Sequence, residues 1–233
     1  TAISRNASKV TIKNENLNVV EIDSTDPAQL AKVAEGKDAI VSAYNPGWAN
    51  PHIYEDTLKY YPKILEGAKK SGVPRLLIVG GAGTLFVKPG LRLMDTGSLP
   101  EAWLPGVKSL GEFYLNTLMN ENDIDWVFLS PAANLGNLKP GVRTGKYRVG
   151  KDDLLVDEKG DSFISVEDYA VAMIDELSSE DEKKKWLFKE NVRLQELSRN
   201  LEDERKLIEI QMGMLQRQQS KNMLLKKQLE SQK

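Results

Sequence analysis

Short apolar runs alternate with longer amphipathic stretches over the first 180 residues. Four runs predict strands, at residues 17–22 (LNVVEI), 39–43 (AIVSA), 75–79 (RLLIV) and 126–129 (WVFL). Apolar positions at helical spacing predict helices between and after them, at 26–35, 53–70, 105–120 and from 165 onward. Strands that are apolar on both faces and separated by helices are typical of a parallel sheet with helices on both sides. The pattern therefore predicts an α/β fold.

The helix ends carry recognisable signals. Asp26 followed by Pro27 predicts a helix start, and Ser71-Gly72 predicts a helix end. Ser165 and Asp168 have the spacing of a capping box. Residues 145–165 are rich in Gly, Asp and Lys turn signals, so we expect short strands or a hairpin there.

The composition changes from residue 181, beyond which the chain has no proline and one glycine, Gly213. Apolar residues recur seven apart from Leu194, with Asn222 in the same series, but most of the intervening heptad positions are polar. We expect a partial dinucleotide-binding domain over 1–188 and a long helical tail over 189–233. The tail is either a weak coiled coil through which the chain self-associates or a solvated amphipathic helix.

The amino-acid composition excludes several kinds of covalent bond and catalytic site. The 233 residues include no cysteine, which excludes disulfides and thiolate catalysis. They include one histidine, His52, so no metal site is predicted. The net charge is -2, and no apolar run approaches the roughly 20 residues of a membrane span. We therefore expect no nucleic-acid or membrane partner and a cytoplasmic location.

A glycine-rich segment, Gly80-Gly81-Ala82-Gly83, follows the strand at 75–79. A dinucleotide-binding loop needs G-x-G-x-x-G with a helix starting inside it, but Phe86 stands at the third glycine position and the residues after it do not begin a helix. The segment is therefore better interpreted as a loop at the end of a later strand, where glycines let the backbone approach a ligand.

Several segments together resemble a known family. They are 2–10 (AISRNASKV), 39–48 (AIVSAYNPGW), 75–85 (RLLIVGGAGTL), 125–132 (DWVFLSPA) and 143–177. In this order they resemble the NAD(P)H-binding, NmrA-like atypical short-chain dehydrogenases, and most closely the bacterial NADH-flavin reductase-like proteins. The resemblance covers residues 1–188 and implies a Rossmann-like parallel sheet.

The resemblance also implies that the N-terminal part of the pattern is absent. The family opens with a strand, a G-x-x-G-x-x-G loop and a helix, whereas Thr1-Ala2-Ile3 is similar to the end of the second strand. Roughly 35 to 40 residues of the pattern would be missing, among them a central strand whose loss would expose apolar edges. The chain is then a fragment, a protein completed by another chain, or a damaged or fused product.

The resemblance assigns cofactor contacts to the ends of successive strands. Arg5 would hold the 2′-phosphate of NADP, and Asp23 would lie near the adenine. Ser42, Ala43, Tyr44 and Asn45 would pass the phosphates and ribose; Gly80, Gly81, Ala82, Ser130 and Pro131 would lie near the nicotinamide. NADP is thereby favoured over NAD, and Pro46-Gly47-Trp48 would wall a substrate pocket or form a packed turn.

No Tyr-x-x-x-Lys pair occurs in the region where short-chain dehydrogenases use one, so the resemblance identifies no catalytic residue. The implied activity is an NAD(P)H-dependent reduction of a flavin, quinone or similar small-molecule acceptor, which depends on cofactor positioning. The alternatives are a non-catalytic NmrA-like sensor or scaffold that oligomerises through the tail, and a fragment without independent function.

Overall fold

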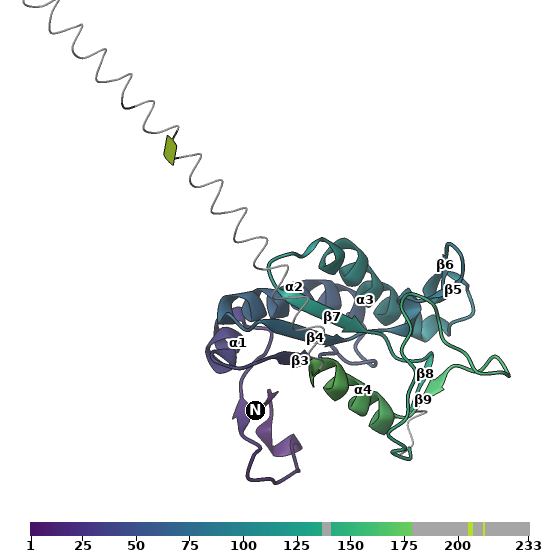
Figure 1. Cartoon of the computed structure of the whole chain (residues 1–233), viewed down its shortest axis with the longest axis horizontal. Helices are drawn as coiled ribbons and strands as arrows, with labels where there is room; N and C mark the ends of the chain where they lie inside the picture. The colour runs from purple at the N-terminus through teal and green to yellow at the C-terminus, as the bar shows by residue number, and fades with distance from the viewer. Residues whose placement is uncertain (137–140, 179–204, 207–211, 213–233) are drawn as a thin grey trace, which may run out of the picture. The chain divides into compact units, whose positions relative to one another are not determined.

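Parallel strands form a two-stranded and a three-stranded sheet in the part of the chain before residue 179, besides a short third pair described below (Figure 1). β1 (Ala2–Ser4) pairs with β2 (Val19–Glu21), and β3 (Ile40–Ser42), β4 (Arg75–Val79) and β7 (Asp125–Leu129) pair in the order β3-β4-β7. The computed structural model describes residues 1–136, 141–178, 205–206 and 212. The predicted α/β fold with a parallel sheet is confirmed.

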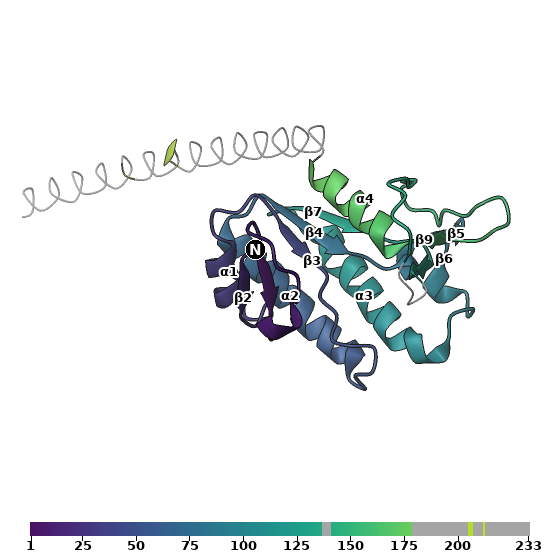
Figure 2. The ribbon, with the colours of Figure 1, turned by 90° about the horizontal axis from the view of Figure 1, so that it is seen from below.

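Helices cover opposite faces of the three-stranded sheet, as Figure 2 shows. α2 (Ile53–Ser71) and α3 (Leu104–Asn116) pack on the face that carries Leu76 and Ile78, and Phe113 of α3 is part of this core. α4 (Val166–Ser178) packs on the other face, against Leu77. Because side chains alternate along a strand, the run at 75–79 supplies apolar groups to both layers.

The helix starts follow local hydrogen bonding. α1 (Pro27–Ala34) is capped by Asp26, whose Oδ1 accepts from the backbone N–H groups of Ala28 and Gln29 at 2.9 and 3.1 Å. The helix expected over 105–120 is shorter than predicted, because α3 ends at Asn116 and residues 118–120 form a 3-10 turn.

The capping box predicted at the start of α4 is half formed. The Ser165 hydroxyl accepts from the backbone N–H of Asp168 at 3.0 Å, as expected. The Asp168 carboxylate, however, accepts from Thr144 and Gly145 in the preceding loop. A tertiary contact has replaced the local one, which a sequence pattern within one helix does not reveal.

The two sheets are separate at β1 and β3, since no backbone ladder joins these strands among the residues that the structure describes. Val41 of β3 is 48% exposed, whereas its register partner Leu77 in β4 is 0% exposed. α4 therefore covers β4 and leaves β3 open, which corrects the expectation of a strand apolar and buried on both faces. The open edge lies where the family resemblance places its central strand.

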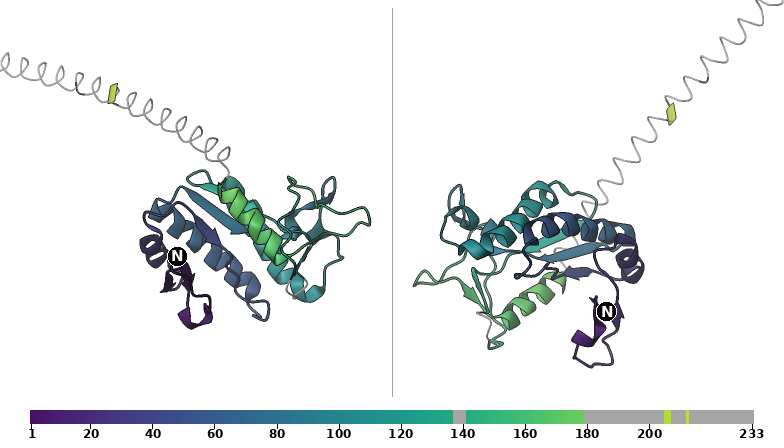
Figure 3. Two further views of the ribbon diagram at one scale, coloured as in Figure 1. Left: turned by 60° about the horizontal axis from the view of Figure 1, so that its bottom comes forward. Right: turned by 180° about the vertical axis from the view of Figure 1, so that it is seen from behind.

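The segments beyond the sheet are mostly irregular (Figure 3). β5 (Phe86–Lys88) and β6 (Leu91–Arg92) form a hairpin, and β8 (Asn134–Leu135) pairs in parallel with β9 (Phe163–Ile164). Of the short strands or hairpin expected within 145–165, the structure has one short strand, 163–164, and no hairpin; Asp153 makes a single bridge to Phe86.

Residues 179–233 form a second unit of the chain. Within it Arg205, Lys206 and Met212 are helical, and the heptad positions and the proposed coiled-coil seam lie outside the described residues. Self-association through this tail, and the boundary at 188, stay predictions. In the described ranges, no helix combines the length and apolar character needed to cross a bilayer.

Candidate functional site

The residues predicted to contact the cofactor follow the carboxyl ends of parallel strands. Arg5 follows β1, Asp23 follows β2, Tyr44 follows β3, Gly80 follows β4 and Ser130 follows β7. Ligands of open α/β sheets bind at this edge, because the loops that leave it come from different strands. The fold thus places these five residues just after the carboxyl ends of parallel strands.

Arg5, Asp23 and Tyr44 influence one another electrostatically across the two sheets. The Asp23 carboxylate accepts from the backbone N–H and hydroxyl of Thr25 at 2.9 and 2.8 Å. These bonds lower the pKa of Asp23, and the positive charge of Arg5 lowers it further. Burial raises the pKa of Tyr44 to about 12, while Arg5 opposes that rise. Arg5, Asp23 and Tyr44 are therefore near enough to interact through their charges.

The loop after β3 is held in place by its own polar contacts. Ser42 is buried, and Ala43 leads into Tyr44, whose carbonyl accepts from the Tyr61 hydroxyl at 2.6 Å. The Asn45 side chain accepts from the Gly47 backbone N–H at 2.7 Å. These bonds fix the backbone that is predicted to pass the cofactor's phosphates and ribose.

Trp48 lies against the first turn of α3. A methyl group at Gly106 would come within 2.9 Å of Cζ3 of Trp48. The indole is nevertheless 60% exposed. Both alternatives for this segment, a pocket wall and a packed turn, stay predictions; Trp48 is not among the residues that line the cavity described below.

The glycines after β4 let the backbone pack closely. The Gly80 N–H donates to the Leu129 carbonyl at 2.8 Å, and a methyl group at Gly80 would lie 2.7 Å from Cε1 of Phe128. A methyl group at Gly83 would lie 2.3 Å from Cγ1 of Val107 in α3. The loop continues into a 3-10 turn over Ala82–Thr84 and then into β5, so no helix begins there. These glycines join β4 to β7 and to α3, and the loop lacks the helix start of a phosphate-binding motif.

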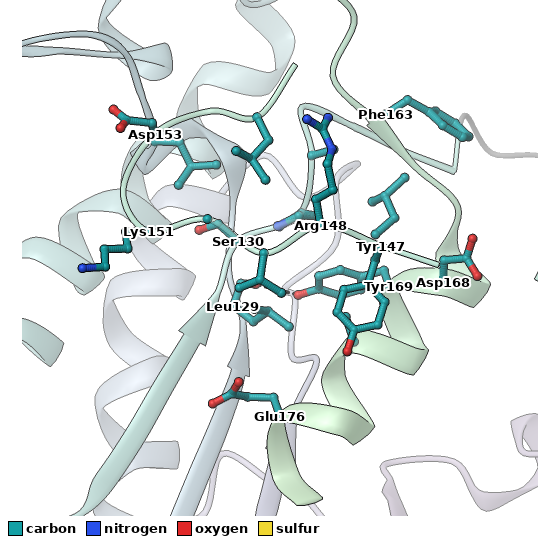
Figure 4. Close-up of a pocket in the computed structure, with 18 of the residues that line it drawn as sticks. Leu129, Ser130, Tyr147, Arg148, Lys151, Asp153, Phe163, Asp168, Tyr169 and Glu176 are labelled. Atoms are coloured by element: carbon teal, nitrogen blue, oxygen red, sulfur yellow. Dashed lines mark hydrogen bonds between the residues drawn. The ribbon is translucent and has the colours of Figure 1, made fainter. Parts of the chain in front are cut away.

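A cavity of about 900 Å³ opens beside the end of β7 (Figure 4). Ser130 and Pro131 line it together with Thr84 and Arg92, and residues 144–155 form much of its outer wall. Tyr169 of α4 also lines it, and its hydroxyl donates to the Leu129 carbonyl at 2.6 Å. Burial raises the pKa of Tyr169, so its hydroxyl stays protonated at neutral pH. The cavity lies next to the residues predicted to contact the nicotinamide.

The loop that forms the outer wall is attached to α4 through Asp168. The carboxylate accepts from the Thr144 hydroxyl at 2.6 Å and from the Thr144 and Gly145 backbone N–H groups, both at 2.8 Å. The hydrogen bond from the Thr144 hydroxyl is the main cause that lowers the pKa of Asp168. The lowered pKa means that these contacts favour the ionised carboxylate.

We expect acid to release this loop. A carboxyl whose folded-state pKa is lowered contributes stability above the ordinary Asp pKa of about 3.9, and that contribution is lost as pH falls through the lower folded value. The Thr144 and Gly145 amide resonances should therefore stay constant from neutral pH to about pH 4 and move below it. Glu158→Gln, on an exposed turn, is the control and should leave the titration unchanged; Asp168→Asn should shift both resonances at neutral pH. A midpoint above the ordinary Asp value would contradict the assignment.

One Tyr-x-x-x-Lys spacing does occur, at Tyr147 and Lys151, outside the region where short-chain dehydrogenases use it. In the dehydrogenases the spacing works because a helix places both side chains on one face, but residues 145–153 have no helix here. The Tyr147 hydroxyl donates to Asp175 at 2.6 Å, and this bond raises the pKa of Tyr147. Figure 4 shows Lys151 pointing away from Tyr147. The pair therefore lacks the geometry for proton transfer.

Thr84 and Arg92 are among the cavity residues that sequence reasoning missed. Arg92 lies in the hairpin of β5 and β6, where its guanidinium donates to the Thr84 carbonyl and stands 4.2 Å from the centre of the Phe86 ring. The turn segment Lys88-Pro89-Gly90, which follows Phe86-Val87 and precedes Leu91, was the signal for this hairpin. Nothing local to the hairpin shows that it folds back over β7.

Comparison with known proteins decides the family. Residues 1–180 match the NAD(P)H-binding family. The chain belongs to this family. The match spans every strand and helix described before residue 179, so the resemblance derived from the separate motifs is confirmed.

Individual relatives support the same family assignment. The uncharacterized protein YwnB of Bacillus subtilis is 40% identical over 185 residues, which are 78% of this chain and 82% of that protein. A solved candidate epimerase from Bacteroides thetaiotaomicron is 56% identical, with a TM-score of 0.71 over 77% of this chain and 79% of that one. A solved candidate NADH-flavin reductase from Streptococcus pneumoniae is 32% identical, with a TM-score of 0.60 over 76% and 80%.

Proposed function

We propose that this protein is an NAD(P)H-dependent reductase of a small conjugated acceptor such as a flavin or quinone. The observation that carries the proposal is the cavity of about 900 Å³ beside Ser130, at the carboxyl edge of a parallel sheet in an NAD(P)H-binding chain. That volume is within the range of small-molecule sites. The likeness to a candidate NADH-flavin reductase supports this acceptor class over others.

The residues at the strand ends suit the two ends of a nicotinamide dinucleotide. Arg5, which follows β1, carries a guanidinium suited to a 2′-phosphate. Its positive charge lowers the pKa of Asp23. Ser130 and Pro131 line the cavity, where the reactive ring would lie, and Gly80 and Ala82 belong to the loop after the neighbouring strand β4. A glycine-rich loop that opens a helix, the usual cradle for the pyrophosphate, is not found among the described residues.

When bound, the reduced nicotinamide supplies a hydride. The chain's part is to place the acceptor against that ring. The Tyr169 hydroxyl donates a hydrogen bond to the Leu129 carbonyl, and the Tyr147 hydroxyl donates one to the Asp175 carboxylate. Neither is arranged as the general acid of a short-chain dehydrogenase, so the proposed reaction depends on positioning.

The test combines binding with turnover on the full chain. Thermal denaturation in NADPH and in NADH reports cofactor binding, because a ligand of the folded state raises its stability. Oxidation of NADPH by menadione or FMN, followed by its absorbance, then reports activity. Absence of a shift at millimolar cofactor would refute cofactor binding. A shift without oxidation would instead support the non-catalytic sensor or scaffold.

Arg5→Gln should weaken NADPH binding about tenfold or more and leave NADH binding almost unchanged. A charge-assisted hydrogen bond to a phosphate contributes about 1.5–3 kcal/mol, and 1.4 kcal/mol is tenfold in affinity. The matched control is Lys37→Gln, because Lys37 precedes β3 and so lies at the opposite edge of the sheet. Titration calorimetry with both cofactors measures the difference. Equal losses for NADPH and NADH would contradict a 2′-phosphate contact.

A further inference from the structure

Two hydroxyl groups meet at the inner end of the cavity. Oγ1 of Thr84 and Oγ of Ser130 are 3.3 Å apart, and either can donate to the other. They come from the loops after β4 and β7, and both residues line the cavity. Thr84 is buried, whereas Ser130 is half-buried. Ser130 is therefore the member of the pair that an occupant of the cavity can reach.

The Thr84 hydroxyl has a second acceptor available. It donates to the Gly81 carbonyl at 3.0 Å. That carbonyl also accepts from the Thr84 backbone N–H at 3.2 Å. The hydroxyl can therefore turn from Gly81 toward Ser130 and leave the carbonyl with a partner, so no buried acceptor becomes unsatisfied. The Thr84 hydroxyl has one proton. Whether it donates that proton to Gly81 or to Ser130 decides in which direction the Ser130 hydroxyl can donate its own.

Arg92 brings a positive charge to the same cavity. The Arg92 guanidinium donates to the Thr84 carbonyl and lies over the Phe86 ring, which holds the side chain from two sides. Arg92 also lines the cavity. A cation held in place before the reaction stabilises negative charge that appears nearby, because it needs little reorganisation.

We propose that Ser130 donates a hydrogen bond to a carbonyl oxygen of a quinone-type acceptor, with Thr84 donating to Ser130 and Arg92 stabilising the charge that forms on that oxygen. This inference rests on the proposed reductase function. A bound reduced nicotinamide would supply the hydride, with its two electrons, to the acceptor and would itself be oxidised. The electron pair displaced in the acceptor moves to the carbonyl oxygen that Ser130 holds, and water then supplies the proton.

Ser130→Ala should lower kcat/KM for menadione with NADPH about 10- to 100-fold, the scale for loss of one oxyanion-stabilising donor. More of the loss should fall on kcat than on KM, since the charge develops in the transition state. Thr84→Val, which keeps the shape and removes the hydroxyl, should lower kcat/KM about 3- to 10-fold. Thr84→Ser restores a hydroxyl and should stay within about twofold of the wild type.

The controls are matched in residue type and burial. Ser71→Ala removes a half-buried hydroxyl at the end of α2, and Thr57→Val removes a buried one inside α2. Both lie outside the cavity and should leave kcat/KM unchanged. Circular dichroism of every variant separates loss of folding from loss of activity.

Binding without turnover separates this inference from the proposed function. Quenching of tryptophan fluorescence by menadione, with NADP⁺ present, should be several-fold weaker in Ser130→Ala than in the wild type. If the wild type never oxidises NADPH, the proposed function fails while this comparison still tests the Ser130 contact. Equal quenching in both proteins, equal kcat/KM, or no menadione binding to the wild type would each overturn the inference.

Discussion

Replacing Phe113 with alanine is expected to lower the free energy of unfolding by about 3–5 kcal/mol. Phe113 projects from α3 into the core on β4 and is 1% exposed. Its ring centre lies 4.8 Å from that of Tyr61, which comes from α2. The substitution removes the buried ring and leaves a cavity where both helices meet the sheet, and the total stability of a domain is only about 5–15 kcal/mol.

Chemical denaturation followed by circular dichroism measures this loss. Phe163→Ala is the matched control, because Phe163 in β9 is 57% exposed. Surface substitutions change stability by about 0.5 kcal/mol or less, so the two phenylalanines should differ several-fold. Similar losses for both variants would show that α3 does not pack on β4 as described.

Gly80→Ala is expected to destabilise the protein by about 1–3 kcal/mol, the usual cost of overpacking. The new methyl group would lie 2.7 Å from the Phe128 ring and 2.9 Å from the Leu129 carbonyl, which is backbone and cannot turn aside. The strands β4 and β7 must then separate where the Gly80 N–H bonds to that carbonyl. Because this point lies beside Ser130, cofactor and acceptor binding should weaken as well.

The neighbouring glycine supplies the control. A methyl group at Gly81 would lie 3.3 Å from Cδ2 of Leu110, the far end of a flexible side chain. Gly81→Ala should therefore lose less than about 1 kcal/mol, and thermal melts of the two variants should separate clearly. A larger loss at Gly81 than at Gly80 would contradict the close approach of β4 and β7.

Local patterns were enough for most of the fold. The run at 75–79 became β4 with the bounds predicted, and Asp26 capped α1 through the bonds that its residue type favours. The errors arose where distant contacts decided the outcome. Asp168 binds Thr144 instead of closing its own helix turn, and Val41 is exposed because α4 does not extend over β3.

Only part of the candidate site could be predicted from the sequence. Family resemblance identified residues at strand ends, since a strand's position in the fold fixes where its loop emerges. The cavity depends on how the β5–β6 hairpin and residues 144–155 fold back over β7, through contacts such as Phe86 with Asp153. Those contacts join segments more than 60 residues apart, and no periodicity in a single sequence records them.

The separation of the two sheets has a consequence for how stability is distributed. In the described part of the chain, no backbone ladder ties β1 and β2 to the larger sheet, so this pair can open at a lower free energy than β4. Arg5 and Asp23 lie at the ends of that pair. A dinucleotide that contacts them must also hold the pair closed, so part of its binding free energy is spent on ordering protein. Affinity and local order at this end of the molecule are therefore linked quantities.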